Sequence, residues 1–268
     1  MPNVQIDVKN VSKSFNRNGR TIQAIDGLNL SIQDGQFVSF VGASGCGKST
    51  FLRMLDGLSP TTSGSIEISG VPVSRPGRDR AFVFQQDRML PWRTVLDNVA
   101  FGLEVQGKKK KEARAAAMEL LTVVGLARFA NSHPGELSGG MRQRANLARA
   151  YAVEPKILLM DEPYAALDGQ TREMMQAWLM ETWETSKRTV LFVTHQIDEA
   201  VYLSDRVIVM TARPGRVKAD IAIDLPRPRT LAVKRTPEFS QYIDQIWSLI
   251  EEEVKESMNL EMQMGASS

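Results

Sequence analysis

The sequence contains a single cysteine, Cys46, so no disulfide bond can form within the chain, and a reducing compartment is favoured. No apolar run approaches the ~20 residues that a membrane-spanning helix needs. The N-terminal MPNVQIDVKN lacks the basic flank and apolar core of a secretory signal. Basic and acidic side chains number 33 and 31, and this near balance gives no support for nucleic-acid binding. We therefore expect any association with a membrane to go through a partner protein.

Composition otherwise matches a globular protein. Hydrophobic residues make up 43% and charged residues 24% of the 268 residues, a length that allows one large domain or two small ones. Disordered and fibrous classes are thereby excluded. Two stretches are strongly basic, GKKKKEAR at 107–114 and PRPRTLAVKR at 226–235. Both are expected to form solvated surface.

Hydrophobic patterning predicts strands that alternate with helices. Residues 37–42 are a continuous apolar run, as in a fully buried strand, and glycines and then a helical pattern follow them. The other expected strands lie at 4–10, 28–32, 64–70, 81–85, 156–162, 189–195 and 205–210. Helices are expected from about 94 to 153, near 169–187, at 197–203 and, as an amphipathic tail, at 239–257.

This order predicts an α/β fold, with a mainly parallel sheet that helices cover on both faces. The main domain is expected to span residues 1–225, with a helical subdomain inserted at about 88–155. Residues 226–268 are expected to form a linker and a helical tail that packs locally.

The stretch GASGCGKST has the G-x-x-x-x-G-K-[ST] pattern of a phosphate-binding loop, with a buried strand before it and a helix after it. Its glycines would let the backbone turn sharply and aim N–H groups at an anion. Lys48 would add a charge at the terminal phosphates, and the Ser49 hydroxyl would ligate Mg²⁺. A glycine-rich turn without a ligand would leave the lysine unexplained. The residues assigned to the nucleotide here are Gly42, Ser44, Gly45, Cys46, Gly47, Lys48, Ser49 and Thr50.

Two adjacent carboxylates end the apolar run ILLMDEP, at the carboxyl end of a predicted strand. Open parallel sheets bind their ligands at such ends. Asp161 would hold Mg²⁺ directly or through its water shell, and Glu162 would orient or deprotonate an attacking water. The alternative, a carboxylate pair that only caps the next helix, does not account for the phosphate loop upstream.

Two further polar residues follow predicted strands in the same way. His195 ends LFVTH, and Gln85 ends AFVFQ just before the helical insert. A lone histidine is more often structural than catalytic. Beside a phosphate loop and paired carboxylates, we instead predict that His195 contacts the transferred phosphate. Gln85 would link the nucleotide to the insert.

The motifs GASGCGKST, VFQ, LSGGMRQR, LLMDEP, ALD and VTH occur in that order, and the chain resembles the ATPase subunit of ATP-binding-cassette (ABC) transporters over roughly residues 4–225. The resemblance implies a P-loop NTPase core with an N-terminal antiparallel β portion, and ATP and Mg²⁺ as cofactors. It assigns Phe15 to stacking on adenine and Asp168 to the D-loop. Gln85 becomes the Q-loop residue, a ligand of both nucleotide and Mg²⁺, and His195 becomes the switch histidine.

The family resemblance also gives LSGGMRQR a role. Ser138, Gly139 and Gly140 open a helix, so they would present a hydroxyl, bare backbone amides and a positive helix end to an anion. In the family these residues bind the nucleotide held by the other subunit, which implies a head-to-tail homodimer. The alternative is an ordinary serine cap, but two glycines would weaken that helix's first turn without other benefit.

Narrower features, MLPWRTVLDNVAFGLEVQG, RPGRV and LPRPR among them, resemble ATPases of importers for nitrate, taurine, alkanesulfonates and bicarbonate. The resemblance implies permease partners in the membrane, an indirect link to a periplasmic or extracellular solute-binding protein, and a peripheral place on the cytoplasmic face of the inner membrane. Met89, Leu90, Pro91 and Trp92 would meet the permease, unless some of them pack inside the insert. The alternatives are a cassette ATPase that acts on nucleic acid or ribosomes, and a nucleotide-binding regulator without turnover.

Overall fold

A computed structural model describes residues 4–17 and 19–265 of the chain. The chain forms two compact units. The first unit is built from the chain up to Gly77 and from Met180 onward, and the second runs from Arg78 to Leu179. None of the helices in the described residues is both long and apolar enough to cross a membrane.

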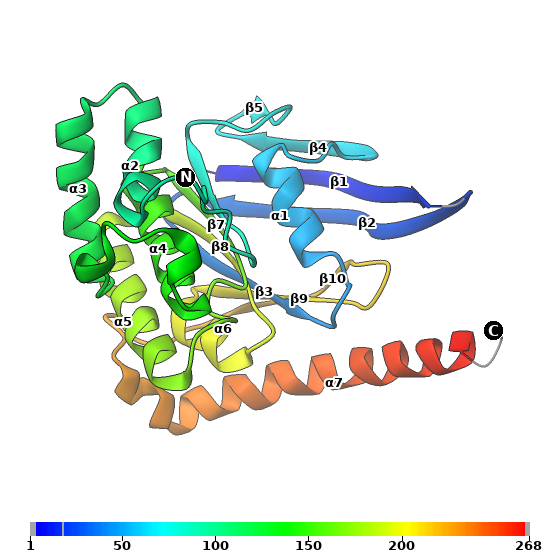
Figure 1. The fold of residues 1–268 in the computed structure, drawn as a ribbon. Coiled ribbons are helices and arrows are strands. Elements are labelled where there is room, and N and C mark those ends of the chain that lie inside the picture. The colour runs from blue at the N-terminus through cyan, green and yellow to red at the C-terminus, as the bar shows by residue number, and fades with distance from the viewer. Residues whose placement is uncertain (1–3, 18, 266–268) are drawn as a thin grey trace. The chain divides into compact units, whose positions relative to one another are not determined.

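The first unit begins with an antiparallel sheet in the order β2-β1-β4-β5 (Figure 1). Its members are β1 (Val4–Arg17), β2 (Arg20–Gln33), β4 (Ser63–Ile68) and β5 (Val71–Pro72). All three neighbouring pairs run antiparallel. The antiparallel β portion predicted at the N-terminus is thus confirmed.

A second sheet of the same unit is mainly parallel. The strand β3 (Phe37–Gly42) lies between β8 (Thr189–Val193) and β9 (Arg206–Met210), and both pairs are parallel. Side chains in β3 and β8 are buried on both faces, which explains their continuous apolar sequences. An antiparallel edge strand, β10 (Val217–Ala222), pairs with β9. The sequence patterning did not predict this strand, because its side chains are only partly buried and mix polar with apolar residues.

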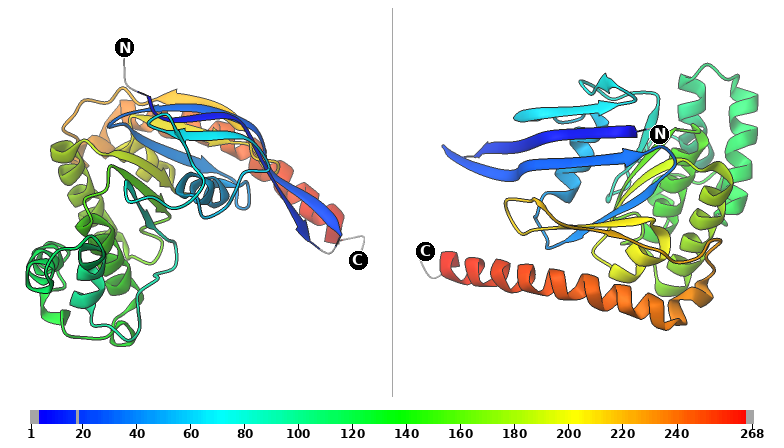
Figure 2. Two further views of the ribbon diagram at one scale, coloured as in Figure 1. Left: turned by 90° about the horizontal axis from the view of Figure 1, so that it is seen from above. Right: turned by 180° about the vertical axis from the view of Figure 1, so that it is seen from behind.

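Helices of the first unit are α1 (Lys48–Asp56), α6 (Ile197–Leu203), the short 3-10 helix η3 (Leu231–Arg235) and α7 (Pro237–Gly265). The predicted amphipathic tail is confirmed as α7, a single long helix (Figure 2). It buries Phe239, Ile246 and Ile250 and leaves Trp247 exposed. Burial of one apolar face stabilises this helix against the unit that carries it.

The second unit contains a parallel strand pair and a group of helices. The strands are β6 (Arg80–Val83) and β7 (Ile157–Asp161). The helices α2 (Val95–Val105), α3 (Lys110–Val123) and α4 (Gly139–Ala152) pack on one another, with 3-10 turns η1 (Ala127–Phe129) and η2 (Pro134–Glu136) between α3 and α4 (Figure 1). Helix α5 (Gly169–Ser186) begins in this unit and carries the chain back to the first. Sequence periodicity had indicated all of these α-helices.

The sequence had suggested that the basic stretch at 226–235 is solvated surface, and this holds only in part, since Arg235 is exposed but Arg229 is buried. Arg229 is 5% exposed, and its guanidinium donates hydrogen bonds to backbone carbonyls at the end of α6 and beyond β10. The acceptors are Val201, Tyr202, Ser204, Ile223 and Leu225. Burial, and then the neighbouring Arg227, lower the pKa of this guanidinium to about 10. The expectation does hold for the other basic stretch, where the lysines at 108–111 are exposed.

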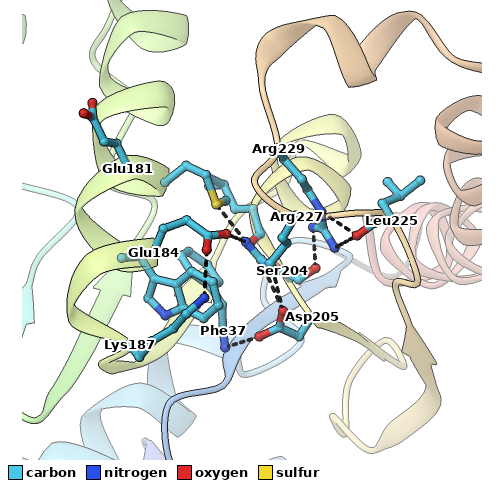
Figure 3. A network of polar contacts seen from close by, with 12 residues as sticks. Phe37, Glu181, Glu184, Lys187, Ser204, Asp205, Leu225, Arg227 and Arg229 are labelled. Carbon is cyan, nitrogen blue, oxygen red and sulfur yellow. Dashed lines mark hydrogen bonds and ion pairs between the residues drawn. The ribbon is translucent and has the colours of Figure 1, made fainter.

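Arg227 joins the same segment to α5 and β9 (Figure 3). Its guanidinium pairs with Asp205 at 2.8 Å and Glu184 at 3.1 Å, and lies 4.1 Å from the ring centroid of Trp183. Asp205 in turn accepts a hydrogen bond from the backbone N–H of Phe37, at the start of β3. The region after the sheet is therefore tied into the first unit by buried and half-buried arginines.

Candidate functional site

The predicted phosphate loop connects the buried strand β3 to helix α1. Its glycines at 42, 45 and 47 have φ angles of 150°, 75° and 103°, which favour glycine. A Cβ on Gly47 would lie 2.8 Å from Cγ1 of Ile25, and one on Gly42 would lie 2.7 Å from the carbonyl oxygen of Met210. Both positions therefore exclude larger residues on steric as well as conformational grounds.

Lys48 is only 7% exposed, and the loop bends around its ammonium group. Nζ donates to the carbonyl oxygens of Gly42 at 2.8 Å and Ala43 at 2.9 Å, and lies 3.4 Å from the sulfur of Cys46. Cys46 is fully buried, so its side chain packs under the loop, whereas Ser44 and Gly45 are exposed. Ser49 and Thr50 follow in the first turn of α1, which contains no acidic residue. No carboxylate in this first turn therefore offsets the positive end of the α1 helix dipole.

His195 leaves the sheet at the same edge as the phosphate loop. Phe40 of β3 pairs with Val193 of β8 in a parallel ladder, so the segments that follow the two strands emerge side by side. His195 is exposed. The preceding Thr194 donates to Oε2 of Glu199 at 2.7 Å and accepts from the backbone N–H of Gln196 at 3.0 Å, which fixes the turn that carries the histidine.

In the second unit, Gln85 and Glu162 meet directly. They follow the paired strands β6 and β7, and Nε2 of Gln85 donates to Oε2 of Glu162 at 3.0 Å. Asp161, the last residue of β7, is 2% exposed, whereas Glu162 is half-buried. The ends of β6 and β7 thus bring together the amide of Gln85 and the carboxylate of Glu162, both of which the sequence had assigned to nucleotide binding and hydrolysis.

Glu162 has a left-handed backbone, with φ of 48°. A non-glycine residue in this region carries a cost on the order of 1–3 kcal/mol, and such residues cluster at functional sites. The carbonyl of Glu162 accepts a hydrogen bond from the N–H of Ala165 at 3.2 Å, so a tight turn holds this conformation. The turn aims the carboxylate toward Gln85 instead of along the line of the strand.

Ser138, Gly139 and Gly140 lie at the start of α4, as predicted. Ser138 is the N-cap, and its Oγ accepts from the backbone N–H of Met141 at 3.3 Å. A Cβ on Gly139 would meet only Nη2 of Arg142, at an ordinary contact distance of 3.9 Å, and the φ of Gly139 is not positive, so neither packing nor conformation requires a glycine there. Gly140 lies close to the turn before α5, where a Cβ would be 3.4 Å from the carbonyl oxygen of Ala166. The local serine cap is real, but it leaves Gly139 unexplained.

Two residues that the family resemblance assigned are exposed. Asp168 caps α5, since its Oδ1 accepts from the N–H of Thr171 at 3.0 Å, and hydrogen bonds with Thr171 lower the pKa of the carboxyl group. Phe15 on β1 is 44% exposed, with Nζ of Lys13 5.1 Å from its ring centroid. An exposed aromatic face beside a cation suits a stacked ligand.

The apolar stretch after Gln85 is only partly exposed. Trp92 is 72% exposed and Pro91 is also exposed, but Met89 is buried at 9% and Leu90 is half-buried. Met89 therefore packs inside the insert, an alternative that the sequence had left open, whereas Trp92 is exposed as a contact with a partner requires. A cavity of about 440 Å³ adjoins Trp92, and its lining includes Asp97, Glu104 and Lys110.

Sequence reasoning missed one segment at the phosphate loop. A Cβ on Gly215 would lie 2.0 Å from the carbonyl oxygen of Cys46, so residues 211–216 pass in direct contact with the loop. The run RPGRV had been noted only for its family resemblance. Its Pro-Gly pair, directly after a buried strand, was the available signal of a tight turn at the strand's carboxyl end.

Comparisons with known proteins agree with this geometry. The profile of the ABC transporter family matches residues 25–165. The nitrate import ATP-binding protein of Synechocystis sp. (strain ATCC 27184 / PCC 6803 / Kazusa) is 44% identical over 253 residues, covering 92% of this chain and 95% of that protein. The taurine import ATP-binding protein of Rhizobium johnstonii is 46% identical over 239 residues, covering 87% and 91%. A dimeric ATP-binding cassette in a post-hydrolysis state, bound to ADP and Pi, superposes with a TM-score of 0.77 at 35% identity and covers 82% of this chain.

Proposed function

This chain belongs to the ABC transporter family and is an ATPase that couples ATP hydrolysis to transport, and on that premise we propose that it powers import of a small anionic solute such as nitrate, taurine, an alkanesulfonate or bicarbonate. The observation that carries this assignment is the similarity to nitrate and taurine import proteins over 92% and 87% of the chain. The solute itself is selected elsewhere in such a system, because the groups described above are suited to a nucleotide.

In this proposal the phosphate loop binds the triphosphate of ATP. The backbone N–H groups at the start of α1 and the ammonium of Lys48 neutralise the phosphate charge. Lys48 exchanges its hydrogen bonds with Gly42 and Ala43 for bonds to phosphate oxygens. Phe15 stacks on the adenine.

The donor groups suit Mg²⁺, which prefers hard oxygen ligands and keeps several waters. The hydroxyl of Ser49, the amide oxygen of Gln85 and the carboxylate of Asp161 would hold it. Bound there, Mg²⁺ would neutralise charge on the phosphates.

Hydrolysis needs a base and a contact to the transferred phosphate. Glu162 would orient or deprotonate water, and the 3.0 Å hydrogen bond from Gln85 supports this role because it holds the carboxylate. His195 supplies a hydrogen bond to the terminal phosphate as charge moves toward the leaving group. Exposure of this histidine allows it to reach a ligand.

A second copy of the chain completes the site. Ser138, Gly139 and Gly140 bind the terminal phosphate of the partner's ATP, which explains a glycine that neither packing nor conformation requires. Asp168 lies in the loop before α5 and takes part in the same contact. A head-to-tail dimer then holds two ATP molecules between its subunits. The similar cassette named above is also dimeric.

Import requires membrane subunits, and the exposed Trp92 is the proposed contact with them. The chain would then sit on the cytoplasmic face of the membrane and communicate only indirectly with a solute-binding protein. The test is affinity isolation from detergent-solubilised membranes, in which a polytopic permease should copurify. Trp92→Asp should lose the permease, whereas Trp247→Asp, a matched change of an exposed tryptophan on α7, should retain it. Isolation with RNA or DNA and no membrane protein would contradict the importer assignment.

A further inference from the structure

The segment at 211–216 forms a fixed wall against the phosphate loop. Its Gly215 is locked to β2 by two backbone hydrogen bonds, from Gly215 to Ala24 at 2.9 Å and from Asp26 to Gly215 at 3.1 Å. The same glycine touches Cys46 so closely that a Cβ would lie 2.0 Å from the Cys46 carbonyl oxygen. The wall and the phosphate loop are therefore held in a fixed relation, backbone against backbone.

Arg213 projects from this wall to the exposed part of the phosphate loop. Its Nη2 lies 3.4 Å from the point that a Cβ on Gly45 would occupy. Arg213 is exposed, and its guanidinium forms no hydrogen bond or ion pair with the part of the chain that the structure describes. The neighbouring Arg216 differs, because it pairs with the carboxylate of Asp26. One arginine of the segment is thus engaged with protein, and the other stands at the phosphate loop with its donors available.

Helix α7 holds the backbone next to Arg213. Glu253 is 6% exposed, and its Oε2 accepts a hydrogen bond from the backbone N–H of Ala212 at 2.6 Å. Its Oε1 pairs with Nζ of Lys218 on β10 at 2.8 Å. A buried carboxylate with two such partners fixes the residue that precedes Arg213, because moving Ala212 would leave a buried charge short of a donor.

We propose that Arg213 is a further phosphate-binding residue of the nucleotide site, and that Glu253 is its positioning residue. The inference rests on the proposed binding of ATP at residues 42–50. A guanidinium offers several N–H donors in a planar fork that matches phosphate oxygens, and its charge adds to that of Lys48. The proposed ligands of this wall are nucleoside di- and triphosphates, whose phosphate groups the loop at 42–50 would hold.

The first experiment compares nucleotide affinities of the full-length protein by fluorescence titration with ATP and ADP. Arg213→Ala should weaken both by about tenfold, the loss expected for one charge-assisted hydrogen bond. Arg213→Lys should recover part of this loss, and Arg216→Ala, the matched control, should bind within about twofold of wild type. Lys48→Ala serves as the reference, with a larger loss. Melting temperatures of all variants identify any that fail to fold.

The outcomes distinguish a failure of the proposed nucleotide site from a failure of the role proposed for Arg213. If wild type binds no ATP, or if Lys48→Ala binds as tightly as wild type, the proposed nucleotide site fails and this inference fails with it. If Lys48→Ala loses affinity while Arg213→Ala matches wild type, only the role of Arg213 is overturned.

A double-mutant cycle tests Glu253. Glu253→Ala should weaken ADP affinity by about threefold in the wild-type background and have no further effect in the Arg213→Ala background, because a positioning residue acts only through the residue it positions. Equal losses in both backgrounds would indicate a general structural role and overturn this assignment. Glu253→Gln keeps an acceptor for Ala212 and should retain most of the affinity.

Discussion

The amide of Gln85 donates a 3.0 Å hydrogen bond to the carboxylate of Glu162, across the ends of two paired parallel strands. Gln85 also lies two residues beyond the end of β6, just before the helical insert begins. A change in the position of the insert therefore reaches the proposed catalytic carboxylate through one hydrogen bond. This relationship would couple ATP hydrolysis to movement of the proposed membrane partner.

Glu162→Gln should retain ATP binding and lose steady-state hydrolysis by about 100-fold or more, because an amide cannot act as the base. The variant should accumulate as an ATP-bound dimer, measurable by size-exclusion chromatography with light scattering. Glu154→Gln is a matched control, since Glu154 is exposed and has the same φ of 48°. Full turnover by Glu162→Gln would refute the catalytic assignment.

Ser138→Arg should leave ATP binding at the phosphate loop nearly unchanged and abolish both ATP-driven dimerisation and hydrolysis. The added side chain occupies the start of α4, where the partner's phosphate is proposed to bind.

Gly139→Ala tests the same contact with a smaller change, because a Cβ fits there and alanine should raise helix stability by roughly 0.5 kcal/mol. Sedimentation of Ser138→Arg and Gly139→Ala with ATP tests the expectation, and Gly135→Ala, at a glycine where nothing lies within 4 Å of an added Cβ, is the control. A Gly139→Ala protein that dimerises normally would argue against the proposed contact.

Arg229→Met should destabilise the protein by about 3 kcal/mol or more, because five buried carbonyl oxygens lose a charged donor. Chemical denaturation followed by circular dichroism measures the change. Arg235→Met, a substitution of an exposed arginine in the same segment, should have little effect. Equal stability of the two variants would show that the carbonyls find other partners.

Acid should weaken the network around Arg227. Burial raises the pKa of Glu184, but hydrogen bonds from Lys187 and Arg227 outweigh it and lower the pKa below its ordinary value of 4.5. Since the folded state holds the carboxylate's proton less tightly than the unfolded state, the stabilisation is present above that value and is lost as the pH falls below it. Glu184→Gln should therefore flatten the decline of the unfolding free energy below about pH 4.5. Glu181→Gln, one turn away and outside the drawn contacts, should keep the wild-type slope (Figure 3).

Sequence patterning predicted the site where its parts are contiguous. The buried run at 37–42, the glycines and Lys48 lie within a dozen residues, so strand, loop and helix could be predicted together. The paired carboxylates at 161 and 162 were predictable for the same reason. The left-handed backbone of Glu162 could not be predicted, since its φ of 48° follows from tertiary contacts and has no local sequence preference.

Long-range partners account for the predictions that failed. Nothing in PRPRTLAVKR distinguishes Arg229, which is buried, from Arg235, which is exposed. The difference lies in carbonyls of α6 about 25 residues away in the chain. Met89 and Trp92 illustrate the same limit, because the packing of the helices decides which of two apolar residues three positions apart is covered.

Arg229 and Glu253 also affect how this protein could be recombined with its relatives. Both lie beyond residue 225, where the main domain was predicted to end, yet one satisfies carbonyls at the end of α6 and the other holds the backbone beside the phosphate loop. A chimaera joined just after Leu225, at that predicted boundary, would place a foreign tail on acceptors shaped for these two side chains. The module that exchanges intact therefore includes α7 at least as far as Glu253.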